Sequence, residues 1–282
     1  VGKADDYSSS GWLWTTNVNI LRRQPAPGCL LNSIRCIRHA MEDFPMRKPE
    51  AKTNKHSSTH TTLNGKKSAA KATRKSQLSA GAAEIDITPP IGTAMVGALE
   101  PRYSTGIDDP LLAKALVLQS GKNRLAIVAL DLATLPRQWG DKCVRAAARK
   151  TGMAPDNIVW CATHTHTGPI AEPEVYADGV KPADLAWLKR LPAQFAEAVA
   201  QALARRKSVT VSRCRTFCTG VATSRRIHFK NGHDLNTWNL DNVDESVQSL
   251  GYASHADPEV GALCFDDAAG KPVASLWTFA CH

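Results

Sequence analysis

From residue 80 onward, apolar and polar positions follow a pattern that predicts strands and helices in turn. Residues 83–87 alternate and predict a strand. Residues 114–119 and 124–132 are two further apolar strands joined by a hairpin turn at residues 121–123. The segment 124–132, RLAIVALDL, is apolar almost throughout, so we expect it to be buried on both faces.

Two segments have the spacing of amphipathic helices. Residues 138–150 place Trp139, Cys143 and Ala147 on one side. Residues 183–206 form the longest predicted helix. Pro192 falls inside it and predicts a kink or a boundary between two helices.

The last third of the chain returns to strands. Residues 209–218, 259–265 and 272–280 predict three strands, whereas residues 222–232 and 236–252 predict loops. Strands mixed with helices in this order indicate an α/β fold, and we expect a layered β-sheet sandwich flanked by helices.

The first 79 residues lack a sustained hydrophobic period. Residues 51–80 are rich in Lys, Ser, Thr and Ala and cannot bury enough apolar surface to offset their conformational entropy. We therefore expect a disordered basic tail over residues 1–79 and one domain over residues 80–282. One hypothesis is that Met41 or Met46 is the natural start, so that the residues before it are upstream sequence.

The charge of the chain is concentrated in this tail. The first 80 residues carry 14 Lys and Arg against 5 Asp and Glu, which accounts for the whole formal net charge of +9. A balanced body gives no electrostatic indication of nucleic-acid binding, and basic runs of this kind are mostly solvated tails. We expect no nucleic-acid partner. A binder of nucleic acid or anionic surfaces through residues 47–75 is the weakest alternative, because that segment lacks interleaved aromatic residues.

The cysteines and the hydropathy argue against further classes of protein. None of the eight cysteines forms a CxxC pair, which argues against a zinc ribbon. Cys161 and Cys281 stand inside apolar strands, and we interpret them as small buried residues rather than nucleophiles. No run of 18 apolar residues predicts a transmembrane helix, and no signal peptide is evident at the start of the chain.

The strongest chemical signal is NIVWCATHTHTGP at residues 157–169. An apolar strand, residues 158–162, runs into a polar turn that carries His164 and His166. Side chains two residues apart in an extended chain point to the same face, so both imidazoles can reach one site. Imidazole is the commonest metal ligand, and the strand before it and the Gly-Pro after it favour a metal site over a pair of hydrogen-bonding histidines.

Two further residues end apolar strands in a similar way. Asp131 follows IVAL and is a candidate site residue, although a cap or turn role explains it equally well. His282 follows SLWTFAC, as His164 follows IVWCAT. Histidines at the ends of separate strands are typical of ligands that neighbouring strands bring together.

The body of the chain resembles a known family. AGAAEIDITPPIG, DPLLAKALVL, IVALDL, ATHTHTGP, the SRR loop, DPEVGALCFDD and WTFACH are similar to segments of the neutral/alkaline, non-lysosomal ceramidases and their bacterial relatives. The resemblance covers roughly 200 of the 282 residues. It implies a zinc-dependent amidase that hydrolyses the N-acyl amide bond of ceramide to sphingosine and a fatty acid.

The same resemblance implies roles for individual residues. His164 and His282 match the histidines that bind one Zn²⁺ ion, and His166 matches a histidine that contacts the reacting centre. Arg225 matches a catalytic arginine best, although Ser224 stands where the family usually has Asn and Arg226 is adjacent. A ceramide-like lipid would be the substrate, with association at a membrane surface. The family resemblance suggests a secreted or periplasmic protein.

Other interpretations remain open. The chain could be a related metallohydrolase acting on another acyl-amide substrate, or a non-catalytic binding remnant, because the family completes its zinc site with a Glu and a Tyr far downstream. These positions are not in the 282 residues. We therefore expect a truncated portion of a longer enzyme that, alone, binds zinc weakly and shows little amidase activity. An open reading frame after the His282 codon would support this expectation.

Overall fold

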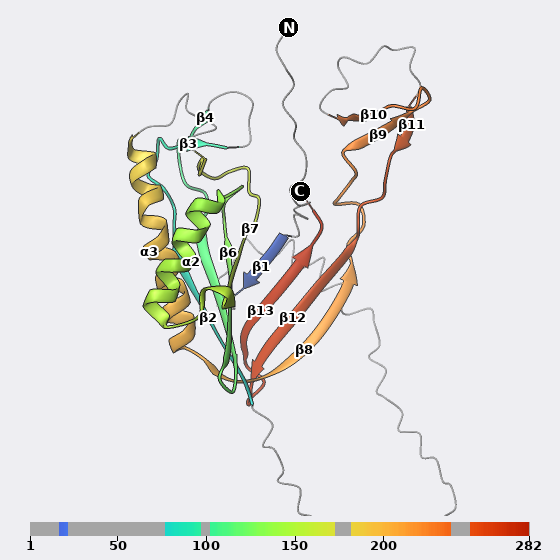
Figure 1. Cartoon of the computed structure of the whole chain (residues 1–282). Helices are drawn as coiled ribbons and strands as arrows, with labels where there is room; N and C mark the ends of the chain where they lie inside the picture. Colours follow the sequence, from blue (N-terminus) through green and yellow to red (C-terminus); the bar gives the residue numbers. More distant parts are fainter. Residues whose placement is uncertain (1–16, 22–76, 97–101, 173–181, 238–248, 282) are drawn as a thin grey trace, which may run out of the picture. The chain divides into compact units, whose positions relative to one another are not determined.

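The computed structural model describes residues 17–21, 77–96, 102–172, 182–237 and 249–281 (Figure 1). The described residues from Leu78 onward, together with 17–21, belong to one compact unit. Its centre is an eight-stranded sheet in the order β1-β13-β12-β8-β2-β5-β6-β7. In the described parts of the chain, no helix has the length and apolar character needed to cross a membrane.

Four strands form the first half of this sheet: β2 (Leu78–Asp86), β5 (Leu112–Ser120), β6 (Asn123–Leu130) and β7 (Ile158–Ala162). The pairs β2–β5 and β5–β6 are antiparallel, and β6–β7 is parallel. A parallel pair needs a crossover connection, and helix α2 (Arg137–Thr151) provides it. The ends of β6 and β7 therefore lie side by side.

The second half consists of β8 (Lys207–Phe217), β12 (Glu259–Asp267), β13 (Pro272–Phe279) and β1 (Asn17–Leu21), all paired antiparallel. It joins the first half through two residue pairs between β8 and β2. Strand β1 also contacts β5, β6 and β7, although these strands lie five, six and seven places away from it in the sheet order. The sheet therefore folds back on itself, and its halves become two layers.

The fold has two apolar cores, one between the two half-sheets and one between the first half-sheet and the helices. Between the two half-sheets lie buried residues from both halves: Ala80, Ala82, Leu116, Ala129, Val209, Phe265 and Ala274. On its other face the first half packs against α2 and α3 (Pro182–Ala204), as Figure 1 shows. Alternation along β5 and β6 explains the division, because Ala115, Val117 and Val128 face the helices while Leu116 and Ala129 face the second half-sheet.

Two glycines allow the helices to approach the sheet closely. A Cβ atom on Gly81 of β2 would lie 2.2 Å from the backbone oxygen of Ala202 in α3. A Cβ atom on Gly140 of α2 would lie 2.3 Å from the ring of Trp160 in β7. A side chain at either position would force the helix away from the sheet.

Two small sheets complete the described fold. Strands β3 (Ala94–Met95) and β4 (Arg102–Tyr103) pair with each other. Strands β9 (Arg226–Phe229), β10 (Asp234–Asn236) and β11 (Ser249–Tyr252) form a three-stranded sheet in the order β10-β9-β11. A short 3₁₀ helix, η1 (Pro155–Asn157), precedes β7.

The expected α/β fold with a layered β-sheet sandwich and flanking helices is confirmed. Three details differ from the sequence prediction. The loops expected at residues 222–232 and 236–252 contain β9, β10 and β11. Pro192 lies inside one continuous helix, so the boundary between helices is excluded, while the alternative of a kink stays a prediction.

The third difference concerns the expected tail. Asn17–Leu21 form β1, and Leu78 begins β2. The sequence NVNIL does alternate, and its register along β13 shows that a short alternating segment can complete a sheet edge. The remaining tail, residues 1–16 and 22–76, lies outside the described residues, so the disorder expected there and the domain boundary at residue 80 stay predictions.

Candidate metal centre

The candidate site lies where β6 and β7 end beside each other. The chain after β7 continues the pairing, because Thr163 N donates to Leu130 O at 2.9 Å and His164 N donates to Leu132 O at 2.9 Å. The segment after β6 thus holds the backbone of the first histidine. Ligand sites in α/β sheets commonly form at the carboxyl ends of parallel strands, and this one does so at the single parallel pair among the described strands.

His164 has an uncommon backbone conformation. Its φ is +60°, and it is the only non-glycine residue with a positive φ among the described residues. Such a conformation costs on the order of 1–3 kcal/mol and persists where the surroundings determine it. Here the hydrogen bond from His164 N to Leu132 O helps to hold it.

The ring of His164 is oriented by a backbone carbonyl. Its Nδ1 lies 2.8 Å from Ala133 O, and a carbonyl oxygen can only accept, so Nδ1 carries the proton in the neutral ring. The lone pair is then on Nε2. Metal-binding histidines usually donate their other ring N–H to a carbonyl or carboxylate in this way, so the side chain fits a zinc ligand.

His166 points to the same place, as its spacing from His164 predicts. The Nε2 atoms of the two rings are 3.4 Å apart, and the ring centroids are 5.0 Å apart at 78°. A separation of 3.4 Å is at the upper limit of a hydrogen bond, so the two Nε2 atoms face each other across a short gap. The two imidazoles therefore have the spacing of groups that act on one centre, and both are half-buried.

The turn that carries His166 is clamped by the strands β3 and β4. The Arg102 guanidinium donates from Nη2 to His166 O at 2.9 Å and to Val96 O at 3.1 Å. Val96 N donates to Gly168 O at 3.0 Å, and Ile170 N to Ala94 O at 3.0 Å. Sequence analysis missed Arg102, because an arginine that binds backbone carbonyls leaves no motif.

The other predicted site residues are placed less completely. Arg225 stands directly before β9, and its backbone oxygen accepts a hydrogen bond from Thr237 N at 2.8 Å. His282 lies outside the described residues. Within the described ranges no group of three or more His, Cys, Asp or Glu side chains is gathered to hold a metal ion. The catalytic role of Arg225 and the metal role of His282 stay predictions.

Asp131 is part of a buried ion pair. Its carboxylate lies 3.0 Å from Lys114 Nζ and accepts a hydrogen bond from Leu112 N at 3.1 Å. The two side chains are only 16% and 11% exposed. This contact network gives Asp131 a structural role directly beside the histidine turn, and its part in the site stays a prediction.

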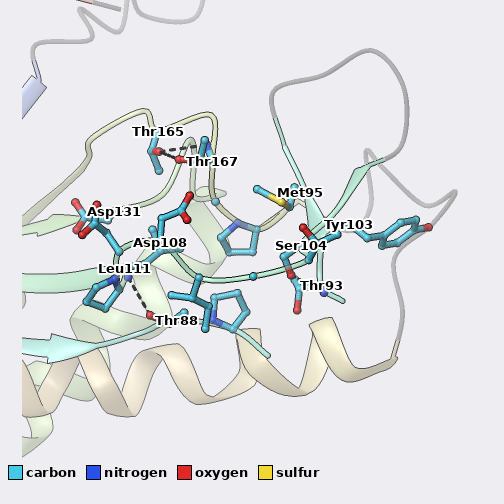
Figure 2. A pocket seen from close by; sticks show the side chains of 18 of the residues that line it. Thr88, Thr93, Met95, Tyr103, Ser104, Asp108, Leu111, Asp131, Thr165 and Thr167 are labelled. Carbon is cyan, nitrogen blue, oxygen red and sulfur yellow. Dashed lines mark hydrogen bonds between the residues drawn. The ribbon is translucent and has the colours of Figure 1, made fainter. Parts of the chain in front are cut away.

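A cavity of about 640 Å³ lies next to the same turn. Figure 2 shows that Thr165 and Thr167 line it. These residues alternate with the two histidines, which are not part of its lining. Hydroxyl groups and carboxylates are prominent in the wall, including Thr88, Ser104 and Asp108. No sequence pattern predicts this cavity, because separate segments of the chain assemble its wall.

Cys161 lies three residues before His164 and is half-buried. Burial raises the pKa of its thiol to about 11. A thiol is nucleophilic as its thiolate, so Cys161 is poorly suited to attack a substrate at neutral pH. This agrees with its interpretation as a small packing residue.

Two solved structures are similar to this chain. The crystal structure of neutral ceramidase from Pseudomonas aeruginosa matches with a TM-score of 0.54 and 23% identity, over 71% of this chain and 31% of that one. A ceramidase complexed with C2 matches with a TM-score of 0.51 and 21% identity, over 70% of this chain and 30% of that one. No protein-family model and no curated protein sequence matches the chain.

These comparisons concern the fold. The chain has a neutral ceramidase-like fold, and it spans about a third of the length of the two ceramidases.

Proposed function

We propose that this chain is a portion of a zinc-dependent amidase of the neutral ceramidase type, which hydrolyses the N-acyl amide bond of ceramide. The observation that carries the proposal is the geometry at the end of β7. His164 is held through Nδ1 by Ala133 O, and its Nε2 lies 3.4 Å from His166 Nε2. The ceramidase-like fold adds support from an independent direction.

In this proposal His164 and His282 hold one Zn²⁺ ion, together with ligands that the 282 residues do not include. Zinc, when bound, supplies a Lewis acid and lowers the pKa of a water molecule to about 7. His164 would bind through Nε2, because Nδ1–H is committed to Ala133 O. The carbonyl thus fixes both the tautomer and the ring orientation.

His166 and Arg225 would act on the substrate. Hydrolysis joins a water oxygen to the acyl carbon, breaks the C–N bond and delivers a proton to the leaving nitrogen. His166 Nε2 can hold and pass that proton, which is a task for which histidine is well suited at neutral pH. The Arg225 guanidinium would donate hydrogen bonds to the negative charge that develops on the carbonyl oxygen.

A related acyl-amide substrate is the second candidate. The cavity beside the histidine turn is lined by many hydroxyl groups and by Asp108, Asp109 and Asp131, with fewer apolar side chains. A long acyl chain favours apolar walls, whereas this lining favours a polar or cationic group. A similar fold does not fix the substrate.

The test uses the protein read from its gene to the natural stop codon. Fluorescent ceramide and a short, polar N-acyl amine are offered separately, before and after EDTA treatment and after zinc is restored. We expect ceramide hydrolysis that EDTA abolishes and zinc restores. Hydrolysis of the polar amide alone would favour the second candidate. Zinc binding without hydrolysis of either substrate would favour a non-catalytic binding remnant.

A further inference from the structure

We propose that Lys114 and Asp131 form a positioning pair that sets the ring orientation of His164. The proposal rests on the proposed function for its importance, but its geometry is independent of any substrate. Neither residue belongs to the ligands or catalytic groups assigned above.

The pair itself is buried and well connected. Lys114 Nζ lies 3.0 Å from Asp131 Oδ2 and 3.3 Å from Oδ1. Leu112 N donates to Asp131 Oδ2 at 3.1 Å, and Asp131 N donates to Leu112 O at 3.0 Å. Asp131 is therefore tied to β5 through both its backbone and its side chain, at the point where β6 ends.

The next two residues after Asp131 are the ones that hold His164. Leu132 O accepts from His164 N at 2.9 Å, and Ala133 O lies 2.8 Å from His164 Nδ1. Both acceptors are backbone carbonyls, so their directions depend on the path of the chain rather than on their side chains. Asp131 fixes where that path begins.

The cost of the pair makes a purely stabilising role a poor explanation. Lys114 is buried on the face of β5 that also carries Leu116, towards the second half-sheet. Removing two charges from water is costly, and apolar residues of similar size often stabilise a fold equally well or better. A structural task that apolar side chains cannot perform, such as fixing the chain at Leu112 N, accounts for the charged pair.

The pair can be removed without leaving a buried charge. Lys114→Met/Asp131→Leu replaces both side chains by apolar ones, and its stability should be close to that of the wild type. Lys114→Met/Asp131→Asn is a second variant, which also removes both charges but keeps an acceptor for Leu112 N. Glu197→Gln is the matched control, because it breaks an ion pair between α3 and Lys150 of α2.

The measurement is the tautomer of His164 in the metal-free protein, from ¹⁵N NMR of its ring nitrogens above the pH at which the ring is charged. His164→Gln identifies the signals. The wild type and Glu197→Gln should show the Nδ1–H form. In Lys114→Met/Asp131→Leu the Nε2–H form should appear as well. Zinc affinity should fall about 10–100-fold, as for other partners of metal ligands.

Two results would overturn the proposal. One is a folded Lys114→Met/Asp131→Leu variant with the wild-type tautomer and zinc affinity. The other is a changed tautomer in Glu197→Gln, which would show that any lost ion pair has this effect. Because the tautomer is read without metal or substrate, it tests the positioning role even if the protein hydrolyses no amide.

Discussion

At the scale of the residue, His164 combines a strained backbone with a fixed ring. Its positive φ turns the chain at the end of β7, and Ala133 O directs the ring. Asn, Asp and His enter the left-handed region more readily than other non-glycine residues. A histidine therefore suits both the positive φ of this position and the hydrogen bond to Ala133 O. In the proposed zinc site, a histidine held in this way would need little rearrangement to bind the metal.

Substitution of the two histidines should separate binding from turnover. His164→Ala should lower zinc affinity more than about 100-fold, because loss of an outer partner alone costs about 10–100-fold. His166→Ala should leave zinc affinity near that of the wild type but lower kcat by about 10²–10⁴-fold, the usual range for a general acid or base. Zinc titrations and steady-state kinetics measure the two effects.

His228→Ala is the control, because His228 pairs with Asp234 across the β9–β10 hairpin. His228→Ala should change neither the zinc affinity nor kcat. If His166→Ala instead lost zinc as His164→Ala does, His166 would be a metal ligand and not a proton carrier.

The sequence predicted that His164 and His166 converge, but it did so for an extended chain. In the structure His164 has a positive φ, so the two rings meet across a turn and not along a strand. The partners of these residues could not be predicted. Ala133 acts through its backbone oxygen and Arg102 binds two carbonyls, so neither interaction depends on a recognisable sequence pattern.

At the scale of the element, the helices pack closely against the first half-sheet, and an ion pair joins them to each other. The glycine in β2 lets α3 lie directly on the sheet. Lys150 of α2 and Glu197 of α3 join the two helices at 2.8 Å, and Gln201 Nε2 donates to the same carboxylate at 2.8 Å. These contacts keep the crossover between β6 and β7 in place.

Gly81→Ala should destabilise the fold. The new Cβ would lie 2.2 Å from Ala202 O and 2.7 Å from Arg206 N, and backbone atoms cannot move aside as a side chain can. Overpacking typically costs about 1–3 kcal/mol, and we expect a loss at or above the upper end in urea unfolding. Gly106→Ala, where no atom lies within 4 Å, should change the free energy of unfolding by less than about 0.5 kcal/mol. Equal effects at both sites would refute the close approach.

The ion pair between the helices should depend on pH. Hydrogen bonds from Lys150 and then Gln201 lower the pKa of Glu197 from its usual value of 4.5. A lowered pKa in the folded state means that the contribution to stability is present above about pH 4.5 and is lost as the pH falls through the folded value.

Glu197→Gln should therefore reduce the free energy of unfolding at pH 7 by a small amount, about 0–1 kcal/mol for an exposed pair, and by less at pH 3. Lys150→Met should remove the same pH-dependent difference. Urea titrations at the two pH values compare the variants, and a difference that persists unchanged at pH 3 would contradict this account.

Most long elements follow from the sequence, and the shorter ones do not. Residues 158–162 were predicted as a strand with the bounds that β7 has, because five apolar residues lie between two polar turns. Strands β9 and β11 have few buried residues, so their sequences lack the hydrophobic alternation that marks a strand. Pro192 begins no new helix, because packing of α3 against the sheet outweighs its local effect.

At the scale of the whole molecule, pairing between distant segments determines the architecture. Strand β1 pairs with β13, more than 250 residues later in the chain, and the sheet folds back at the short β8–β2 junction. Hydrophobic periodicity predicts strands but not their partners, so the number of layers was predictable and the strand order was not. The part of the chain that shares its fold with the two ceramidases covers 31% and 30% of their lengths.

The central claim is that His164, at the end of β7, holds a zinc ion. The most direct measurement is a competitive zinc titration of the protein read to its natural stop codon, alongside its His164→Ala variant. The account predicts one tightly bound zinc per chain in the wild type and an affinity more than about 100-fold lower in the variant, with an unchanged circular dichroism spectrum. Equal zinc affinity in the two folded proteins would contradict it.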